Sequence, residues 1–212
     1  MILCAITNLL RLIVKKVQDY YFKKAKQDNY PARSVYKLEE AQKKYGFIKT
    51  GDKVLDLGCH PGSWSLYAAK IVGPRGIVYG ADLQKSNPVS VSGGGQIEFI
   101  CADIFDDDFL SPASLHLPFQ VVLSDLAPKT TGHKFSDHLK SIELSRRALY
   151  IAGKVLRQGG QFYCKVFQGE DFPVFVNEVR QFFKKVKVVK PKSSRVESRE
   201  VFLLGFDFVG FV

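Results

Sequence analysis

The 212-residue sequence has few of the residues that build metal sites or disulfide frameworks: four cysteines and four histidines. The cysteines include no C-x-x-C pair, and the closest histidines, His133 and His138, lie five positions apart in a polar stretch. Such spacing suits neither a zinc site nor a disulfide-rich fold. We therefore expect no metal, and reduced thiols in a cytoplasmic protein. The cysteines are Cys4, Cys59, Cys101 and Cys164.

The sequence also lacks an apolar run that could span a bilayer. The N-terminal apolar segment, residues 1–14, is shorter than the roughly 20 residues of a membrane helix, and Asn8 and Arg11 interrupt it. Lys15 and Lys16 come after it, with no small-residue cleavage site, so the segment does not resemble a secretory signal. We expect a frayed or packed amphipathic helix, with an organelle-targeting remnant as the alternative, and no membrane partner.

Acidic residues are too few to balance the basic ones, which leaves a formal net charge of +10. Residues 15–46 carry nine Lys/Arg against four Asp/Glu, residues 184–200 carry seven against two, and the remainder balances. Solvated surface charge explains a single lysine, but two concentrated segments favour a polyanion such as a nucleic acid. Aromatic residues at 20–22 and 36 could stack on bases, although we expect most of them in the core.

The chain has neither an internal repeat nor a linker that would divide it, and its length fits one α/β domain. Helical patterns at about residues 12–28 and 33–45 precede an alternation of strands and helices. This alternation predicts a parallel, doubly wound sheet, in which the last two strands can pair antiparallel at one edge. We expect strands at 53–57, 77–83, 97–102, 119–124, 161–167, 185–190 and 200–208, and helices at 62–72, 137–157 and 172–184.

The run VLDLGCHPGSW, residues 54–64, joins the first strand to the following helix through a glycine turn. Such a turn places a nucleotide-like ligand over the carboxyl end of the strand, and glycine lets the backbone turn sharply and approach it. A dinucleotide fingerprint has three glycines, as G-x-G-x-x-G, whereas this run has only Gly58 and Gly62. The turn therefore favours a ligand without a pyrophosphate, such as S-adenosylmethionine, over a nicotinamide cofactor.

Three acids, Asp82, Asp103 and Asp125, stand where consecutive predicted strands end. The carboxyl ends of parallel strands line the ligand crevice of such a sheet. Asp82 can reach ribose hydroxyls, Asp103 can accept a hydrogen bond from an adenine amino group, and Asp125 would face the reacting end of the ligand. Each acid alone could be a turn or helix-cap residue, but three at consecutive strand ends favour a site.

Lys165 lies in the predicted strand GQFYCKVFQG, among aromatic and aliphatic neighbours. A buried lysine costs free energy unless it is paired or has lost its proton. Lys165 is therefore a candidate general base. The alternative is a side chain that reaches out of the strand end into water.

Seven short motifs, in order over about residues 20–208, are similar to those of the FtsJ/RrmJ family of S-adenosylmethionine-dependent RNA ribose 2′-O-methyltransferases: ARSVYKLEE, DLGCHPGSW, GADLQ, ADI, SDLAPKTTG, CKVFQG and SREVFLLG. The resemblance implies a basic helical arm, residues 1–30, and one Rossmann-like class I methyltransferase domain, residues 31–212. Its sheet would have seven mostly parallel strands, the last antiparallel, with helices on both faces. The implied catalytic residues are Lys37, Asp125, Lys165 (the proton acceptor) and Glu200, and the implied cofactor contacts are Gly62, Trp64, Asp82, Asp103 and Asp125.

The resemblance further implies S-adenosylmethionine as cofactor and methylation of a uridine ribose in large-subunit ribosomal RNA. The protein would act as a monomer on ribosomal RNA or on the large ribosomal subunit. Alternatives are transfer RNA or an mRNA cap as substrate, or a non-catalytic RNA-binding module. Two features depart from the family pattern: Cys59 and His60 replace small residues before the Pro-Gly pair, and the loop at 86–96 is longer than usual.

Overall fold

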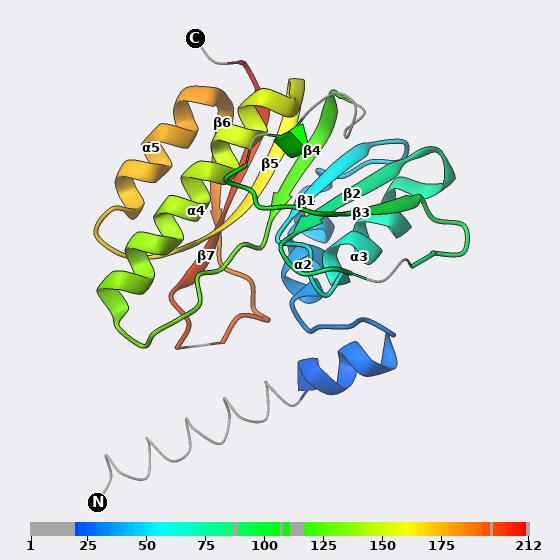
Figure 1. The fold of residues 1–212 in the computed structure, drawn as a ribbon, viewed down its shortest axis with the longest axis horizontal. Helices are drawn as coiled ribbons and strands as arrows, with labels where there is room; N and C mark the ends of the chain where they lie inside the picture. Colours follow the sequence, from blue (N-terminus) through cyan, green and yellow to red (C-terminus); the bar gives the residue numbers. More distant parts are fainter. Residues whose placement is uncertain (1–19, 87–88, 107, 111–116, 196, 211–212) are drawn as a thin grey trace, which may run out of the picture.

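The computed structural model describes residues 20–86, 89–106, 108–110, 117–195 and 197–210. Their strands form one seven-stranded sheet in the order β3-β2-β1-β4-β5-β7-β6 (Figure 1). Neighbouring strands from β3 to β5 are parallel, whereas β7 is antiparallel to both β5 and β6. The strands are β1 (Lys53–Leu57), β2 (Ile77–Asp82), β3 (Gln96–Cys101), β4 (Phe119–Ser124), β5 (Leu156–Phe167), β6 (Phe183–Val189) and β7 (Glu200–Phe208).

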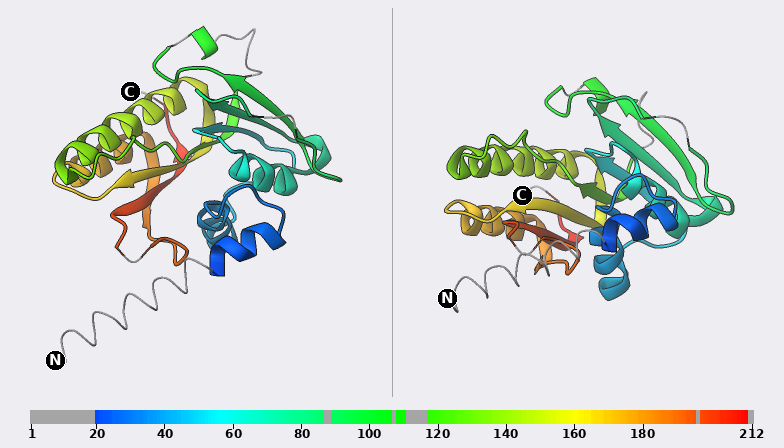
Figure 2. Two further views of the ribbon diagram at one scale, coloured as in Figure 1. Left: turned by 60° about the horizontal axis from the view of Figure 1, so that its bottom comes forward. Right: turned by 90° about the horizontal axis from the view of Figure 1, so that it is seen from below.

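Helices cover both faces of this sheet (Figures 1 and 2). The helices α4 and α5 pack on one face, and α2 and α3 pack on the other. Two short 3₁₀ helices, η1 and η2, lie in connections. The bounds are α2 (Val35–Tyr45), α3 (Ser63–Val72), η1 (Gly73–Arg75), η2 (Asp108–Leu110), α4 (Lys134–Val155) and α5 (Phe172–Phe182). The predicted Rossmann-like α/β class, with one antiparallel strand among parallel ones, is confirmed.

The alternation of side chains along each strand explains why both faces are apolar. In β1, Leu55 and Leu57 belong to the core under α4 and α5, whereas Val54 belongs to the core under α2 and α3. In β7, Leu203 belongs to the core under α4 and α5, and Phe202 belongs to the core under α2 and α3. A strand buried on both sides has a nearly continuous apolar sequence, which is the pattern of a parallel sheet covered by helices.

Residues 20–27 form a helix that packs against α2. Ala25 is buried there, the ring of Tyr21 lies 5.3 Å from that of Tyr36, and the Tyr36 hydroxyl donates to Asp28 at 2.9 Å. Tyr36 is thus a core residue, as expected, whereas Tyr20 is exposed. The predicted apolar segment 1–14 and the start of the predicted arm helix lie outside the described residues.

The boundary between α4 and β5 differs from the expectation of a helix at 137–157 and a strand from 161. The helix ends at Val155, and Leu156 already pairs with Phe119 of β4. A register shift between Phe119 and Val121 accommodates the early start, and Gly159 takes a left-handed backbone there (φ 74°). The boundary is set by pairing with β4, which cannot be predicted from the hydrophobic pattern of the segment itself.

Cys59, Cys101 and Cys164 are free thiols, as expected, and Cys4 lies outside the described residues. Across the described ranges no helix is both long and apolar enough to cross a bilayer. Among the same residues, no cluster of three or more His, Cys, Asp or Glu side chains is placed to hold a metal ion.

Candidate active site

A cavity of about 520 Å³ opens at the carboxyl ends of β1, β2 and β4. The chain runs outward from β1 to β2 and β3, then returns to add β4 on the other side of β1, so the cavity lies at the topological switch point. Its volume is that of a site for a ligand of nucleoside size. Its lining comprises Gly58, His60, Asp82, Leu83, Gln84, Ala102, Asp103, Ile104, Phe105, Asp125, Leu126, Ala127, Lys129 and Leu144.

The glycine turn shapes the floor of this cavity. Gly58 has φ 75°, and a Cβ atom placed there would lie 2.9 Å from Cδ2 of Leu126. Gly62 has φ 100° and caps the start of α3. Only glycine tolerates both conditions at Gly58, and the group that a Cβ atom would meet belongs to Leu126, so packing within the protein accounts for this glycine. The close approach of the backbone to a ligand stays a prediction.

Trp64 does not extend into the cavity. Its side chain is 2% exposed, its indole N–H donates to the Ser34 carbonyl at 2.9 Å, and its ring stacks on Tyr163 with centroids 5.6 Å apart. The tryptophan side chain therefore belongs to the core beneath α2. The predicted cofactor contacts of Gly62 and Trp64 stay predictions. Because the Trp64 side chain is buried, Trp64 could contact the cofactor only through its backbone, in the first turn of α3, where N–H groups lack helical partners.

The three predicted acids lie around the same cavity. Asp82 accepts from the backbone N–H of His60 at 3.0 Å through Oδ2 and from that of Gln84 at 2.9 Å through Oδ1. Asp103 is exposed and accepts from Phe105 N–H at 2.9 Å. A carboxylate oxygen can accept more than one hydrogen bond, so both acids retain capacity for ligand hydroxyl or amino groups.

Lys165, on β5, and Asp125, directly after β4, form an ion pair. The lysine Nζ lies 2.8 Å from Asp125 Oδ1 and 2.5 Å from the Asp125 carbonyl oxygen. The side chains are only 7% and 16% exposed. The amine is thus held at the edge of the cavity. The alternative, in which the Lys165 side chain reaches out of the strand end into bulk water, is wrong.

A second ion pair joins Lys37 on α2 to Glu200 at the start of β7. The lysine Nζ lies 2.7 Å from Glu200 Oε1, and the side chains are 13% and 12% exposed. Burial opposes ionisation of Glu200, but the charge of Lys37, its hydrogen bond and the charge of Lys165 outweigh burial, so the Glu200 pKa lies below its ordinary value.

The register of β5 and β7 brings the two pairs together. Lys165 is opposite Phe202, and Phe167 is opposite Glu200. Lys165 and Glu200 are therefore diagonal neighbours on one face, about 7–8 Å apart at the backbone. The structure thus brings all four predicted catalytic residues to one place, although they come from four different elements.

Asp56 is a buried acid of β1 that is not among the candidate site residues predicted from the sequence. It is fully buried in β1, Oδ2 accepts from the Ser65 hydroxyl at 2.6 Å, and Oδ1 has no partner among the described atoms. Burial, together with the negative charges of Asp125 and Asp82, raises its pKa to about 7 against the effect of the Ser65 hydrogen bond. The signal in the sequence was an acid within an otherwise apolar strand.

The connection from β6 to β7 is tied to α2, which the sequence did not indicate. Glu40 accepts from the backbone N–H groups of Lys192 and Ser193 at 2.6 and 2.9 Å. Arg33 donates to the Ser193 carbonyl at 3.0 Å. These contacts hold the segment that leads into Glu200.

Comparison with known proteins agrees with this geometry. Residues 30–208 match the model of the FtsJ-like methyltransferase family. A Desulfotalea psychrophila protein named ribosomal RNA large subunit methyltransferase E is 52% identical over 196 residues, covering 92% of this chain and 98% of that protein. A Bdellovibrio bacteriovorus protein of the same name is 46% identical over 191 residues, covering 89% and 95%.

Solved structures show the same fold. A ribosomal RNA methyltransferase of Plasmodium falciparum superposes with a TM-score of 0.75 at 27% identity, covering 86% of this chain and all of that one. Aeropyrum pernix fibrillarin, solved with natively bound S-adenosyl-L-methionine, has a TM-score of 0.57 at 17% identity and covers 81% and 76%; at that identity only the fold is shared. With its matched motifs and its four clustered charged residues, the chain belongs to the FtsJ-like methyltransferase family.

Proposed function

We propose that this protein transfers the methyl group of S-adenosylmethionine to a ribose 2′-hydroxyl in large-subunit ribosomal RNA, with a uridine as the target nucleotide. The observation that carries the proposal is the buried Lys165–Asp125 pair at the edge of the cavity. The relatives named for methylation of large-subunit ribosomal RNA support the substrate, because they match nearly the whole chain.

The cavity suits an adenosine ligand with an amino-acid tail. Asp82 retains acceptor capacity for the ribose hydroxyls, Asp103 for the adenine amino group, and the exposed Phe105 and Leu83 supply apolar surface beside them. The first turn of α3, from Gly62 to Trp64, would present backbone N–H groups to the tail. When bound, S-adenosylmethionine supplies a methyl group on a positively charged sulfur.

Lys165 would take the proton of the 2′-hydroxyl as the neutral amine, after the ammonium of the ion pair has released its own proton to solvent. A ribose hydroxyl is a weak nucleophile and must lose its proton as the new bond forms. Asp125 holds the amine by its carboxylate and its carbonyl oxygen, which fixes the direction from which Lys165 meets the hydroxyl. Alignment of the reacting atoms would supply much of the rate, since proximity contributes about 7–11 kcal/mol in favourable cases.

Lys37 would position the target nucleotide, and Glu200 would orient Lys37. Their ion pair is largely shielded from water, so its geometry is held more firmly than that of a surface pair. A positive side chain at this point can contact a phosphate or ribose oxygen of the RNA. No metal is needed for this proton transfer.

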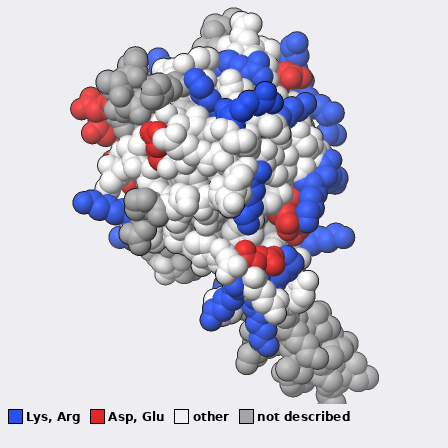
Figure 3. All heavy atoms as spheres, turned by 90° about the vertical axis from the view of Figure 1, so that its right-hand side faces the viewer, with Lys and Arg blue, Asp and Glu red and all other residues white. Residues whose placement is uncertain are grey.

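The two basic segments would form the RNA-binding surface of a cytoplasmic monomer. Figure 3 shows Lys and Arg outnumbering Asp and Glu on one face, gathered along one margin and beside the start of the described chain. Phosphate contacts from such lysines would make binding weaken steeply with salt. Binding that is insensitive to salt would contradict this part of the proposal.

The deciding experiment maps ribose methylation in ribosomal RNA from cells that lack the protein. We expect one large-subunit position to lose its 2′-O-methyl group and to regain it with the wild-type gene but not with Lys165→Ala. In vitro, ribosomal particles, transfer RNA and capped RNA are compared as methyl acceptors. Methylation of transfer RNA or of the cap alone would contradict the proposal that ribosomal RNA is the substrate. Absence of S-adenosylmethionine binding in calorimetry would instead favour a non-catalytic RNA-binding module.

A further inference from the structure

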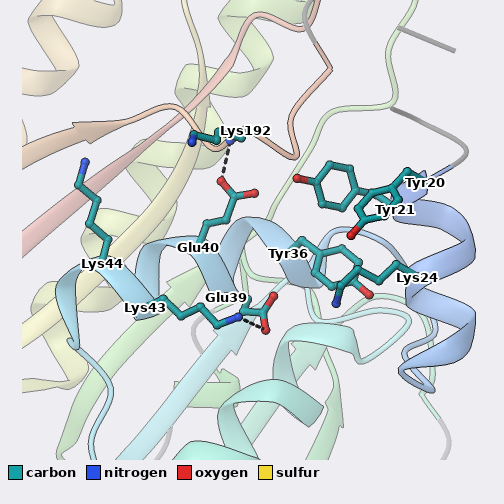
Figure 4. Close-up of a pocket in the computed structure, with 9 residues that line it drawn as sticks. All are labelled: Tyr20, Tyr21, Lys24, Tyr36, Glu39, Glu40, Lys43, Lys44 and Lys192. Carbon is teal, nitrogen blue, oxygen red and sulfur yellow. Dashed lines mark hydrogen bonds and ion pairs between the residues drawn. The ribbon is translucent and has the colours of Figure 1, made fainter. Parts of the chain in front are cut away.

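A second cavity, of about 540 Å³, lies outside the active site, between the helix of residues 20–27, the helix α2 and the connection from β6 to β7 (Figure 4). We call it the α2 groove. It is lined by Tyr20, Tyr21, Lys24, Tyr36, Glu39, Glu40, Lys43, Lys44 and Lys192. Its lysines come from both basic segments of the sequence, which are more than 130 positions apart, and the fold joins them in one groove.

The two acids of the α2 groove are both engaged by protein groups, but only Glu39 has a charged partner. Glu39 pairs with Lys43 at 2.8 Å, and Glu40 accepts the backbone N–H of Lys192 (Figure 4). Glu40 also accepts the backbone N–H of Ser193. Lys44 and Lys192 are exposed, and no described carboxylate lies within ion-pair distance of either. The groove lining therefore carries four lysines against two acids, a net charge of +2, and the ammonium groups of Lys44 and Lys192 remain available to a ligand.

An aromatic ring stands at the other side of the groove from these lysines (Figure 4). Tyr20 is 59% exposed and is supported edge-on by Tyr21, with ring centroids 5.2 Å apart. Tyr36 is not available, because it is 2% exposed and Lys24 lies over its ring. An exposed ring that faces lysines across a groove suits single-stranded nucleic acid, in which bases stack on aromatic rings and phosphates contact cations. An acidic peptide would use the charges and leave the ring without a partner.

The groove shares two walls with the active site. The helix α2 carries Lys37 in the active site and Lys44 in the groove, seven residues or about 10 Å along the helix axis. The connection that carries Lys192 leads to Glu200, the partner of Lys37. An RNA strand that leaves the active site along α2 therefore reaches the groove.

We propose that the α2 groove binds the single-stranded RNA next to the nucleotide being modified, with phosphates at Lys44 and Lys192 and a base stacked on Tyr20. This inference rests on the proposed function, since it places the flanking part of the same substrate. It predicts that the groove contributes to RNA binding and leaves the chemistry at Lys165 unchanged.

The test uses a transcript of large-subunit ribosomal RNA, with methyl transfer followed by labelled S-adenosylmethionine. We expect Lys44→Ala/Lys192→Ala to raise KM for the transcript about tenfold, with kcat and cofactor affinity unchanged. Two lost phosphate contacts would also reduce the slope of log binding constant against log salt by about 1.4. The matched control is Lys49→Ala/Lys154→Ala, which removes the same charge from exposed positions outside the groove.

Tyr20 separates stacking from charge. Tyr20→Ala should raise KM for the transcript, and Tyr20→Phe should keep it near the wild-type value because the ring remains. Wild-type KM and salt slope in the lysine variant would overturn the proposal and favour an acidic protein segment as occupant. Transcript binding is also measured in a Lys165→Ala background, so the groove is tested independently of methyl transfer. If the proposed function were wrong, the wild-type protein would methylate no ribosomal RNA. If only the groove proposal were wrong, the wild-type protein would methylate ribosomal RNA and the lysine variant would bind the transcript as tightly as the wild type does.

Discussion

The Nζ atom of Lys37 lies 2.7 Å from Oε1 of Glu200, although 163 positions separate the two residues in the chain. The contact joins α2 to the first residue of β7. Both side chains are mostly buried, so each one depends on the other for its charge to be tolerated.

Glu200→Gln should destabilise the protein by about 1–3 kcal/mol at neutral pH, because Lys37 loses its counter-charge while it stays largely buried. The folded-state pKa of Glu200 lies below the ordinary 4.5, so its contribution is present above 4.5 and disappears as the pH falls through the folded value. Urea unfolding of both proteins at pH 7 and in acid measures this. An undiminished stability difference in acid would contradict the linkage, and a cycle with Lys37→Met isolates the pair.

Lys165→Ala should retain cofactor affinity and lose methyl transfer by roughly 10²–10⁴-fold, the usual contribution of a general base. Lys165→Arg is the sharper variant, because it keeps the positive charge beside Asp125 while its guanidinium cannot give up a proton. Calorimetry with S-adenosylmethionine and single-turnover methylation of ribosomal RNA measure the two properties. Near-wild-type turnover in either variant would remove Lys165 from the proton-transfer step.

Asp56→Asn should flatten the pH dependence of stability. The folded protein holds the Asp56 proton up to about pH 7, whereas the unfolded chain releases it near 3.8. The stability from this proton is therefore complete below 3.8 and is lost as the pH rises to about 7, an effect on the order of 4 kcal/mol. Unfolding free energies across this range test it, with Ser65→Ala as a control that keeps the titrating carboxyl. An Asp56→Asn profile as steep as the wild type would contradict the assignment.

Glu40→Ala should loosen the connection from β6 to β7 and lower kcat without changing cofactor affinity. Two backbone N–H groups lose their acceptor, so the amides of Lys192 and Ser193 should exchange faster with solvent. Glu40→Gln keeps one acceptor oxygen and should recover part of the activity. The neighbouring Glu39→Ala removes a pair with Lys43 but no acceptor of the β6–β7 connection, and it serves as the control for amide exchange. Unchanged amide exchange in Glu40→Ala would show that the connection is held by other contacts.

Much of the architecture follows from the sequence alone. The alternation of apolar strands and amphipathic helices predicts the sheet, and the acids at the strand ends meet at one cavity, because parallel strands present their carboxyl ends at one edge. The lysine in an apolar strand correctly marked a buried, paired amine. Those features are local, and each depends on residues within one element or one turn.

Other features required the tertiary structure. Four features depend on which elements pack together. They are the burial of the Trp64 side chain, the early start of β5, the hydrogen bonds from the β6–β7 connection to Glu40, and the meeting of the two basic segments in the α2 groove. The sequence by itself determined which residue types stand at the ends of which strands. The register of β5 against β7 and the docking of α2 decided which charges meet, because contacts between distant residues are set by packing and carry no local periodic signal.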